Sequence, residues 1–257
     1  MQMLSHSQLE TWQTCPLRWK FQRVDKLPEE PQEALVLGIA VHAAIEADNR
    51  ARLEGQPAMT QDALAAKAQH TLQGSAESAL APLLPDLAAR AGVILSVYAR
   101  QVQPLFHPLA VESWFRFDLP AHPGWAFTGR IDALVQNNAG QTLIVDYKTG
   151  ARGWGPGHEH RAAQATAYVW AMQQAGRDMP VVVFIPLVVS ASIWGYTARY
   201  ELRRTERTPE DIALYQRVIA RVIGEMQEAS VTSSYPARPG WHCRWCPYRS
   251  CCPAQAG

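Results

Sequence analysis

The sequence lacks the features that would announce a partner or a compartment most directly. Its 24 Lys and Arg residues nearly balance its 23 Asp and Glu residues, for a formal net charge of +1. Any basic surface for nucleic acid must therefore be local. The opening residues show no basic segment followed by an apolar one, and we expect no signal peptide. The longest apolar run, 181–189, is interrupted by Pro186 and is too short for a membrane span. These absences predict a soluble, cytoplasmic protein with no membrane partner.

Other absences narrow the architecture. The sequence contains no glycine-rich phosphate loop of the Gly-x4-Gly-Lys-Ser/Thr type, so we expect no helicase motor here, and any unwinding would need a partner. No proline- or glycine-rich linker and no internal repeat divides the 257 residues. Hydrophobic residues make up 47% of the chain and charged residues 18%, which supplies a core and argues against disorder. We expect a single domain over 1–257.

The hydrophobic pattern is helical at first and then strand-like. We expect helices over 5–24 (interrupted at Pro16), 38–53, 61–80, 85–102, 158–175 and 209–229. We expect strands over 109–119, 125–136, 141–147, 181–189 and 192–202. This order predicts an α/β fold with a mixed central sheet flanked by helices. Its parts would be a helical N-terminal part over 1–105, a core over 106–205, and a C-terminal helix with a cysteine-rich tail over 206–257.

Two of the predicted strands carry acidic residues within apolar runs, Asp132 in GRIDALV and Asp146 in IVDYKTG. A short turn at 137–140 joins these strands, so the two carboxylates should lie side by side. Lys148 follows Asp146 by two residues and points to the same face of its strand. Carboxylates suit Mg²⁺ or Mn²⁺, which acidify a bound water, while an ammonium group stabilises developing charge. Alone, however, an Asp-x-Lys sequence is common at solvated strand ends.

Three further polar residues complete a series of motifs. His42 lies on a predicted amphipathic helix, where a satisfied core histidine is the plainer interpretation. Gln164 and Tyr168 lie one turn apart on one face of the helix after the Asp-x-Lys strand, and alone would be an ordinary helix surface. The combined order resembles the motif series of RecB-like PD-(D/E)xK nucleases: His42, Asp132, Asp146, Lys148, Gln164 and Tyr168. The resemblance spans nearly the whole chain and implies the restriction-endonuclease-like form of the α/β fold.

The resemblance also implies a role for each motif residue. The implied ligands of Mg²⁺ or Mn²⁺ are His42, Asp132, Asp146 and the backbone carbonyl of Tyr147. Lys148 would position or deprotonate the attacking water, and Gln164 and Tyr168 would hold the DNA strand and orient the site. Glu112, on the preceding strand, matches a frequent family glutamate and would be an auxiliary ligand, although an exposed strand carboxylate fits its position equally well.

The chain has five cysteines, four of them crowded near its end. In a cytosolic chain of this size, a metal is a better explanation for such a cluster than disulfides. The spacing Cys243-x2-Cys246-x5-Cys252, with Cys15 near the start, resembles the iron–sulfur form of the family, as in AddB-type helicase–nuclease subunits and CRISPR-associated adaptation exonucleases. Four thiolates can hold a [4Fe–4S] cluster, or tetrahedral zinc as the alternative. The adjacent Cys251 could replace Cys252.

After Glu228 the sequence contains arginines and aromatic residues but no acid. Such interleaving suits a single strand, since cations pair with phosphates while aromatic rings stack on bases. Alternatively, the aromatic rings pack around the cysteines and the arginines are solvated.

The sequence therefore predicts a metal-dependent deoxyribonuclease. We expect a single-strand exonuclease that leaves 5′-phosphates in DNA repair, recombination or CRISPR adaptation, with possible helicase or CRISPR adaptation partners. Both polarities, and endonuclease action, remain open at this point. The alternatives are a non-catalytic DNA-binding or scaffold subunit with a metal-stapled fold, and a zinc-bearing interaction module.

Overall fold

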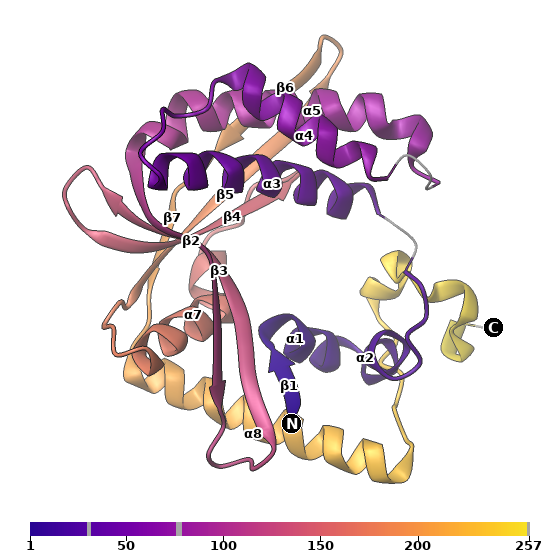
Figure 1. Ribbon diagram of the computed structural model, residues 1–257. Helices are drawn as coiled ribbons and strands as arrows, with labels where there is room; N and C mark the ends of the chain where they lie inside the picture. The colour runs from indigo at the N-terminus through magenta and orange to yellow at the C-terminus, as the bar shows by residue number, and fades with distance from the viewer. Residues whose placement is uncertain (30–31, 76–78, 256–257) are drawn as a thin grey trace. The chain divides into compact units, whose positions relative to one another are not determined.

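The structure is a computed structural model that describes residues 1–29, 32–75 and 79–255. The chain divides into two compact units. Two long strands, β2 (Phe106–Asp118) and β3 (Trp125–Asn137), contribute residues to both units (Figure 1). Unit 1 comprises Met1–Glu30, Arg116–Gly129 and Pro209–Gly257, and unit 2 comprises Pro31–Phe115 and Arg130–Thr208.

Unit 2 contains a mixed β-sheet. Besides parts of β2 and β3, its strands are β4 (Thr142–Gly150), β5 (Val181–Ser192), β6 (Gly195–Tyr200) and β7 (Arg203–Glu206). β4 is antiparallel to β3, with Val145 opposite Ala133, and parallel to β5, with Asp146 opposite Phe184. β5 also pairs antiparallel with β6 and β7. A mixed sheet flanked by helices confirms the predicted fold class.

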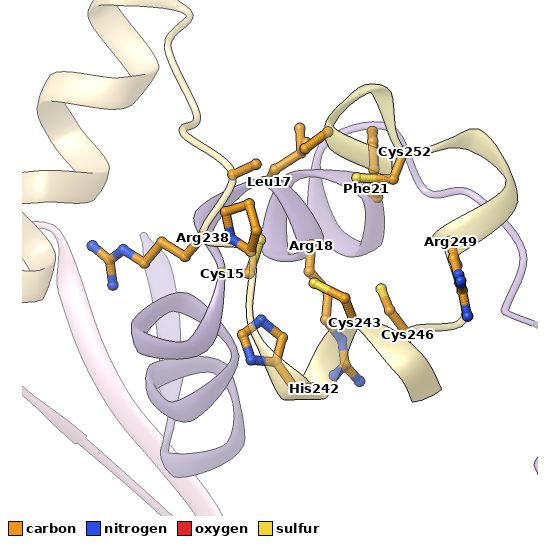
Figure 2. A pocket seen from close by; sticks show the side chains of 13 residues that line it. Cys15, Leu17, Arg18, Phe21, Arg238, His242, Cys243, Cys246, Arg249 and Cys252 are labelled. Carbon is orange, nitrogen blue, oxygen red and sulfur yellow. The ribbon is translucent and has the colours of Figure 1, made fainter. Parts of the chain in front are cut away.

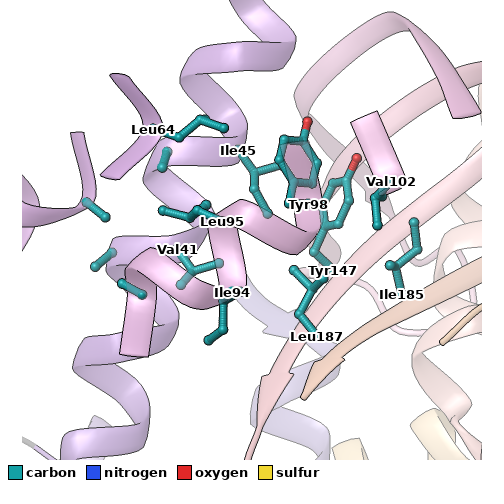
Figure 3. Packing of buried hydrophobic residues seen from close by; sticks show 14 of the residues in the cluster. Val41, Ile45, Leu64, Ile94, Leu95, Tyr98, Val102, Tyr147, Ile185 and Leu187 are labelled. Carbon is teal, nitrogen blue, oxygen red and sulfur yellow. The ribbon is translucent and has the colours of Figure 1, made fainter. Parts of the chain in front are cut away.

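Helices cover both faces of this sheet (Figure 1). One face carries α3 (Glu33–Leu53), α4 (Gln61–Gln73) and α5 (Leu84–Val97), and the other carries α7 (Ala163–Gln174) after the short α6 (His158–Arg161). Successive side chains on β5 point to opposite faces. Ile185 and Leu187 therefore join the hydrophobic core beneath α3 and α5, where they lie near Val41, Ile45 and Ile94 (Figure 3).

The helix boundaries differ in places from those predicted. α3 begins at Glu33, ahead of the predicted start at residue 38, and α4 ends at Gln73. The expected continuation of α4 over 76–78 lies outside the described residues. α5 ends at Val97 and is followed by a π turn, Tyr98–Val102, and a 3₁₀ turn, Gln103–Leu105. These turns direct the chain into β2.

Unit 1 begins with a strand that the sequence did not predict. β1 (Gln2–Ser5) runs parallel to the first residues of β3, with Gln2 opposite Trp125. The predicted interrupted helix is confirmed as α1 (His6–Thr14) and α2 (Pro16–Arg23), separated by Cys15 in extended conformation. Pro16 occupies the first helical position, where its missing N–H costs nothing. The unit also contains α8 (Pro209–Thr232) and the 3₁₀ turns Trp241–Trp245, Arg249–Cys251 and Pro253–Gln255.

The helical stretch Ala81–Leu105 is long and apolar enough to cross a membrane by length and composition alone. Within unit 2, however, its residues Leu87, Ala91 and Ile94 are completely buried in the core beside α3 and α4. This is the pattern of a core helix in a folded domain. The cytoplasmic location stays a prediction.

Candidate active site

A buried polar network fixes α3 against the sheet. Asp48, which is fully buried, accepts hydrogen bonds from Tyr98 Oη at 2.8 Å and Gln103 Nε2 at 2.7 Å. Next to it, Asn49 Nδ2 donates to Tyr147 Oη at 3.5 Å. Buried polar groups with satisfied partners specify one arrangement of the elements that carry them. The network therefore sets the position of α3, and with it His42, relative to β4.

Four of the predicted residues form a closed ring of contacts. Lys148 Nζ lies 2.7 Å from Asp146 Oδ2 and donates to Gln164 Oε1 at 2.8 Å. Gln164 Nε2 donates to Tyr168 Oη at 2.6 Å, and Tyr168 Oη donates to Asp146 Oδ1 at 2.7 Å. Each polar group thus orients the next. Gln164 and Tyr168 are not an ordinary helix surface, since Tyr168 is only 4% exposed.

Asp132 and His42 lie beside this ring. The antiparallel β3–β4 register pairs Ala133 with Val145; Asp132 comes one residue before Ala133 and Asp146 one residue after Val145, so the two aspartates lie side by side just beyond this pair. Asp132 Oδ2 accepts a hydrogen bond from the Tyr147 backbone N–H at 3.0 Å and lies 3.5 Å from His42 Nδ1. The structure thus brings together the predicted histidine and both predicted aspartates from α3, β3 and β4.

Burial governs the ionisation of these groups. Burial, and then the Asp146 carboxylate, raise the pKa of Asp132 well above its usual range, although Lys148 opposes the shift. Burial also lowers the pKa of His42, against the opposing effect of Asp146. For Tyr168, burial raises the pKa and keeps its hydroxyl a hydrogen-bond donor. A neutral imidazole can donate a lone pair to a metal ion, and a carboxyl group with a raised pKa ionises more readily beside a cation. Both groups are therefore suited to metal binding.

Glu112 lies at the same site rather than in solvent. Its side chain is 9% exposed, and Oε2 lies 2.5 Å from Arg130 Nε. Burial raises the pKa of Glu112, while Arg130 lowers it. Glu112 and Arg130 line an open groove of about 520 Å³ that is also lined by His42 and Lys148. The exposed alternative for Glu112 is therefore wrong, and its carboxylate lies within reach of the groove.

The donor set fits a hard divalent cation. Asp146 Oδ2 is buried and accepts no hydrogen bond among the described residues, so its charge depends on the ion pair with Lys148. Carboxylate oxygens and a neutral imidazole are ligands that Mg²⁺ and Mn²⁺ accept. In the part of the chain that the structure describes, no three His, Cys, Asp or Glu side chains already converge as around a bound ion. Metal binding would therefore draw Asp146 away from Lys148.

Arg207, which the sequence did not single out, holds α7 in place. The predicted helix over 158–175 is divided at Ala162, whose backbone is extended. Arg207 is 7% exposed, and its guanidinium donates to the carbonyls of Glu159 and Ala162 and to Thr166 Oγ1. These bonds tie the carbonyls on both sides of the helix break, and the first turn of α7, to one guanidinium group. The residue thus positions the helix that carries Gln164.

Unit 1 gathers cysteines around a separate pocket (Figure 2). The cysteines that line it are Cys15, Cys243, Cys246 and Cys252, together with Arg18 and His242. Cys251 is exposed, and its Sγ donates to the Tyr248 carbonyl at 3.4 Å. Of the two adjacent thiols, the one in the pocket is therefore Cys252.

The pocket has the chemistry of a thiolate site. Burial raises the pKa of Cys246, the Tyr248 backbone and Arg18 lower it, and nearby Cys15 and Cys252 raise it further. A bound metal centre would stabilise the thiolate form of this group. The lining thus fits a cationic group held by sulfur.

Comparison with known proteins identifies the fold. The family described as the PD-(D/E)XK nuclease superfamily matches residues 3–253. A solved structure from Eubacterium rectale named "Putative exonuclease" is 13% identical with a TM-score of 0.52, and the match covers 88% of this chain and 79% of that chain. The structure of SSO0001 is 15% identical with a TM-score of 0.45, covering 99% of this chain and 87% of that chain. No curated protein matches the chain.

The match to the family model agrees with the residues of the candidate active site. The family model covers nearly the whole sequence. On β4 the sequence Asp146-Tyr147-Lys148 has the form of the (D/E)XK in the family's description. The protein belongs to the PD-(D/E)XK nuclease superfamily.

Proposed function

We propose that the protein is a metal-dependent deoxyribonuclease of the RecB-like type that degrades single-stranded DNA from an end and leaves 5′-phosphates. The observation that carries this proposal is the ring of Asp146, Lys148, Gln164 and Tyr168 beside Asp132. Burying a carboxylate is costly unless it is paired. Asp146 is only 1% exposed, and a buried cluster that opens onto a groove is typical of catalytic sites rather than of surface ion pairs.

The proposed ligands of Mg²⁺ or Mn²⁺ are His42, Asp132, Asp146 and the backbone carbonyl of Tyr147. Burial lowers the pKa of His42, and a hydrogen bond to the Tyr147 backbone partly opposes this shift; that contact supports a shared position for these two ligands. When bound, such a cation polarises the phosphodiester and acidifies a water. Glu112 would act as an auxiliary ligand from the wall of the groove.

Lys148 would position the attacking water and take part in its deprotonation. Gln164 accepts a hydrogen bond from Lys148, and so fixes the direction of the ammonium group. With Asp146 engaged as a ligand, the Lys148 ammonium would orient the water and stabilise the developing negative charge. Tyr168 and Gln164 would orient the site and hold the DNA strand.

The cysteine pocket is proposed to hold a [4Fe–4S] cluster, with zinc as the alternative. Its ligands would be Cys15, Cys243, Cys246 and Cys252, a choice supported by their position around one pocket. Coordination would tie the start of α2 to the C-terminal tail and close a loop spanning most of the chain. The cluster would then stabilise the fold rather than take part in hydrolysis.

The exposed aromatic residues of the tail support a single-stranded substrate. Trp241 is 82% exposed and Trp245 59%, and the Arg244 guanidinium lies 5.5 Å from the Trp245 ring centroid. Exposed rings and cations suit stacked bases and phosphates. The setting is proposed to be DNA repair, recombination or CRISPR adaptation in the cytoplasm, with a helicase or adaptation proteins as partners and residues 1–257 acting as one nuclease domain.

The test is cleavage of single-stranded DNA labelled at either end, by anaerobically purified protein with Mg²⁺ or Mn²⁺. Asp146→Ala should abolish metal-dependent degradation, whereas Asp62→Ala, at an exposed position on α4, should not. The label that is released first gives the polarity, and internal cuts would indicate an endonuclease. If folded, metal-loaded protein cuts no DNA with either metal, the proposal is wrong and the scaffold alternative stands.

A further inference from the structure

The groove beside the candidate active site has an unusual wall at Glu112. In the middle of β2 this residue has a φ of 48°, in the left-handed region that non-glycine residues rarely adopt. Such conformations persist only where the surroundings maintain them, and they cluster at functional sites. The Glu112 side chain forms an ion pair with Arg130 of β3.

Arg130 links this wall to an exposed aromatic ring. Its guanidinium carbon lies 5.5 Å from the centroid of the Trp114 ring. The ion pair with Glu112 engages Arg130 Nε, which is one of five N–H donors on the guanidinium group. The Arg130 side chain is half exposed and lines the groove together with His42 and Lys148. Arg130 therefore connects Trp114 to the groove.

Trp114 is 74% exposed on β2. A single exposed apolar residue needs no explanation by itself. This ring, however, lies against a cation that lines the candidate active site. Leu35 and Ile39 of α3, which also line the groove, are 55% and 53% exposed. Apolar surface, an aromatic face and an arginine together match the sugar, base and phosphate of a nucleotide.

We propose that Trp114 and Arg130 form a subsite for one unpaired nucleotide next to the cleavage site. The indole ring stacks on the base, and Arg130 pairs with a phosphate of the same strand. Glu112 holds Arg130 in position. An unpaired nucleotide is favoured because stacking partners in a duplex already cover the faces of each base. This inference rests on the proposed nuclease function and adds the way in which the strand is gripped.

The experiment measures binding separately from cleavage. In an Asp146→Ala background, which should not cut, fluorescence anisotropy gives the affinity for a labelled oligothymidine and for the same strand with abasic sites. Stacking predicts that the intact strand binds more tightly, that Trp114→Ala weakens its binding about tenfold, and that Trp114→Ala leaves the abasic strand unaffected. Trp114→Phe should retain most of the difference, because phenylalanine also stacks.

Trp194→Ala is the matched control, because this tryptophan is 91% exposed at the turn between β5 and β6 of the same unit. It should bind both strands as the background does. If Trp114→Ala binds both strands as the Trp194 variant does, the proposed subsite is wrong. This holds even if the unmodified protein cleaves DNA, because the nuclease function would then stand without the subsite. If Trp114→Ala instead abolishes self-association without changing DNA affinity, the ring is a protein contact and the inference also fails. Absence of cleavage by the unmodified protein would contradict the proposed function instead.

Discussion

Asp132 and Asp146 lie in paired strands, whereas Cys243, Cys246 and Cys252 lie in or beside short 3₁₀ turns. In unit 2, Tyr168 and Lys148 already compensate the buried Asp146 without any metal. In the pocket of unit 1, burial raises the pKa of the Cys246 thiol, and nearby Cys15 and Cys252 add to this shift against the opposing effects of the Tyr248 backbone and Arg18. Polypeptide contacts thus shape the first site, whereas we expect the second to depend on the proposed metal centre.

Because of this difference, we expect metal removal to affect the two regions in different ways. The acid–lysine site should keep its shape without a divalent ion, because its ring of hydrogen bonds closes on itself. The cysteine tail should lose its structure without the proposed metal centre, because short turns have little stability of their own. A chelator should therefore stop the chemistry in one region and unfold the other. Four predictions test this contrast.

The largest effect is expected from Lys148→Met. The variant should lose about a thousandfold or more in cleavage rate, because the water loses its orienting cation. It should bind Mn²⁺ at least as tightly, because Lys148 no longer competes for Asp146. Single-turnover cleavage and calorimetric titration check the two parts, with Lys67→Met, at an exposed position on α4, as the control. Weaker Mn²⁺ binding in the variant would show that Lys148 does not compete with the metal.

The cysteine pocket should respond in stability rather than in chemistry. Cys15→Ser should lower the iron and sulfide content and reduce the free energy of unfolding by about 4 kcal/mol, the closure entropy of a loop this long. Cys251→Ser should change neither, because that thiol lies outside the pocket. Metal analysis and urea titration under anaerobic conditions make the comparison. Zinc without iron would favour the alternative metal. An unchanged unfolding curve for Cys15→Ser would show that coordination by Cys15 does not stabilise the fold.

Much of the first region could be predicted from the sequence because its residues follow local rules. Asp132 and Asp146 flank one short turn, and antiparallel pairing then places them together. Gln164 and Tyr168 share a helix face through their spacing. Their bonds to Lys148 and Asp146 could not be predicted, since these depend on how α7 packs on the sheet. The roles assigned to all these residues stay predictions.

Features set by long-range contacts were missed. β1 is too short to show an alternating pattern, and it exists through its pairing with β3. The helix break at Ala162 contains no proline or glycine, so no residue at the break predicts it from the sequence. The role of Arg207 could not be found from its neighbours in sequence, because the groups that it binds on and beside α6 and α7 lie more than forty residues away.

Arg207→Met tests whether the polypeptide alone shapes the acid–lysine site. Replacing a buried cation by an apolar side chain of similar length removes the guanidinium hydrogen bonds to the carbonyls of Glu159 and Ala162. We expect a loss of about 3 kcal/mol in the free energy of unfolding, and a tenfold or greater loss of cleavage at saturating Mn²⁺. Arg204→Met, on the exposed side of β7, is the matched control. Equal activity in both variants would show that α7 is held without Arg207.

The smallest effect concerns pH and the aspartate pair. Since burial and Asp146 raise the pKa of Asp132, the folded state holds this proton more tightly than the unfolded state, where the pKa is about 3.9. In metal-free protein, this group's contribution to stability is therefore complete below about pH 3.9. It is lost as the pH rises toward the raised value.

The lowered pKa of His42 has the opposite effect, because the unfolded state gains that proton first as the pH falls through about 6.5. The informative quantity is therefore the difference between the unmodified protein and Asp132→Asn, followed by urea unfolding in EDTA. Asp132→Asn should gain stability relative to the unmodified protein as the pH rises, by about 1.4 kcal/mol for each unit by which the Asp132 pKa is raised. Saturating Mn²⁺ should reverse this difference, because the metal stabilises only the ionised carboxylate. If the free energies of unfolding of the two proteins change with pH in parallel without metal, folding does not raise the pKa of Asp132. Lys148 would then fully offset the effects of burial and of Asp146.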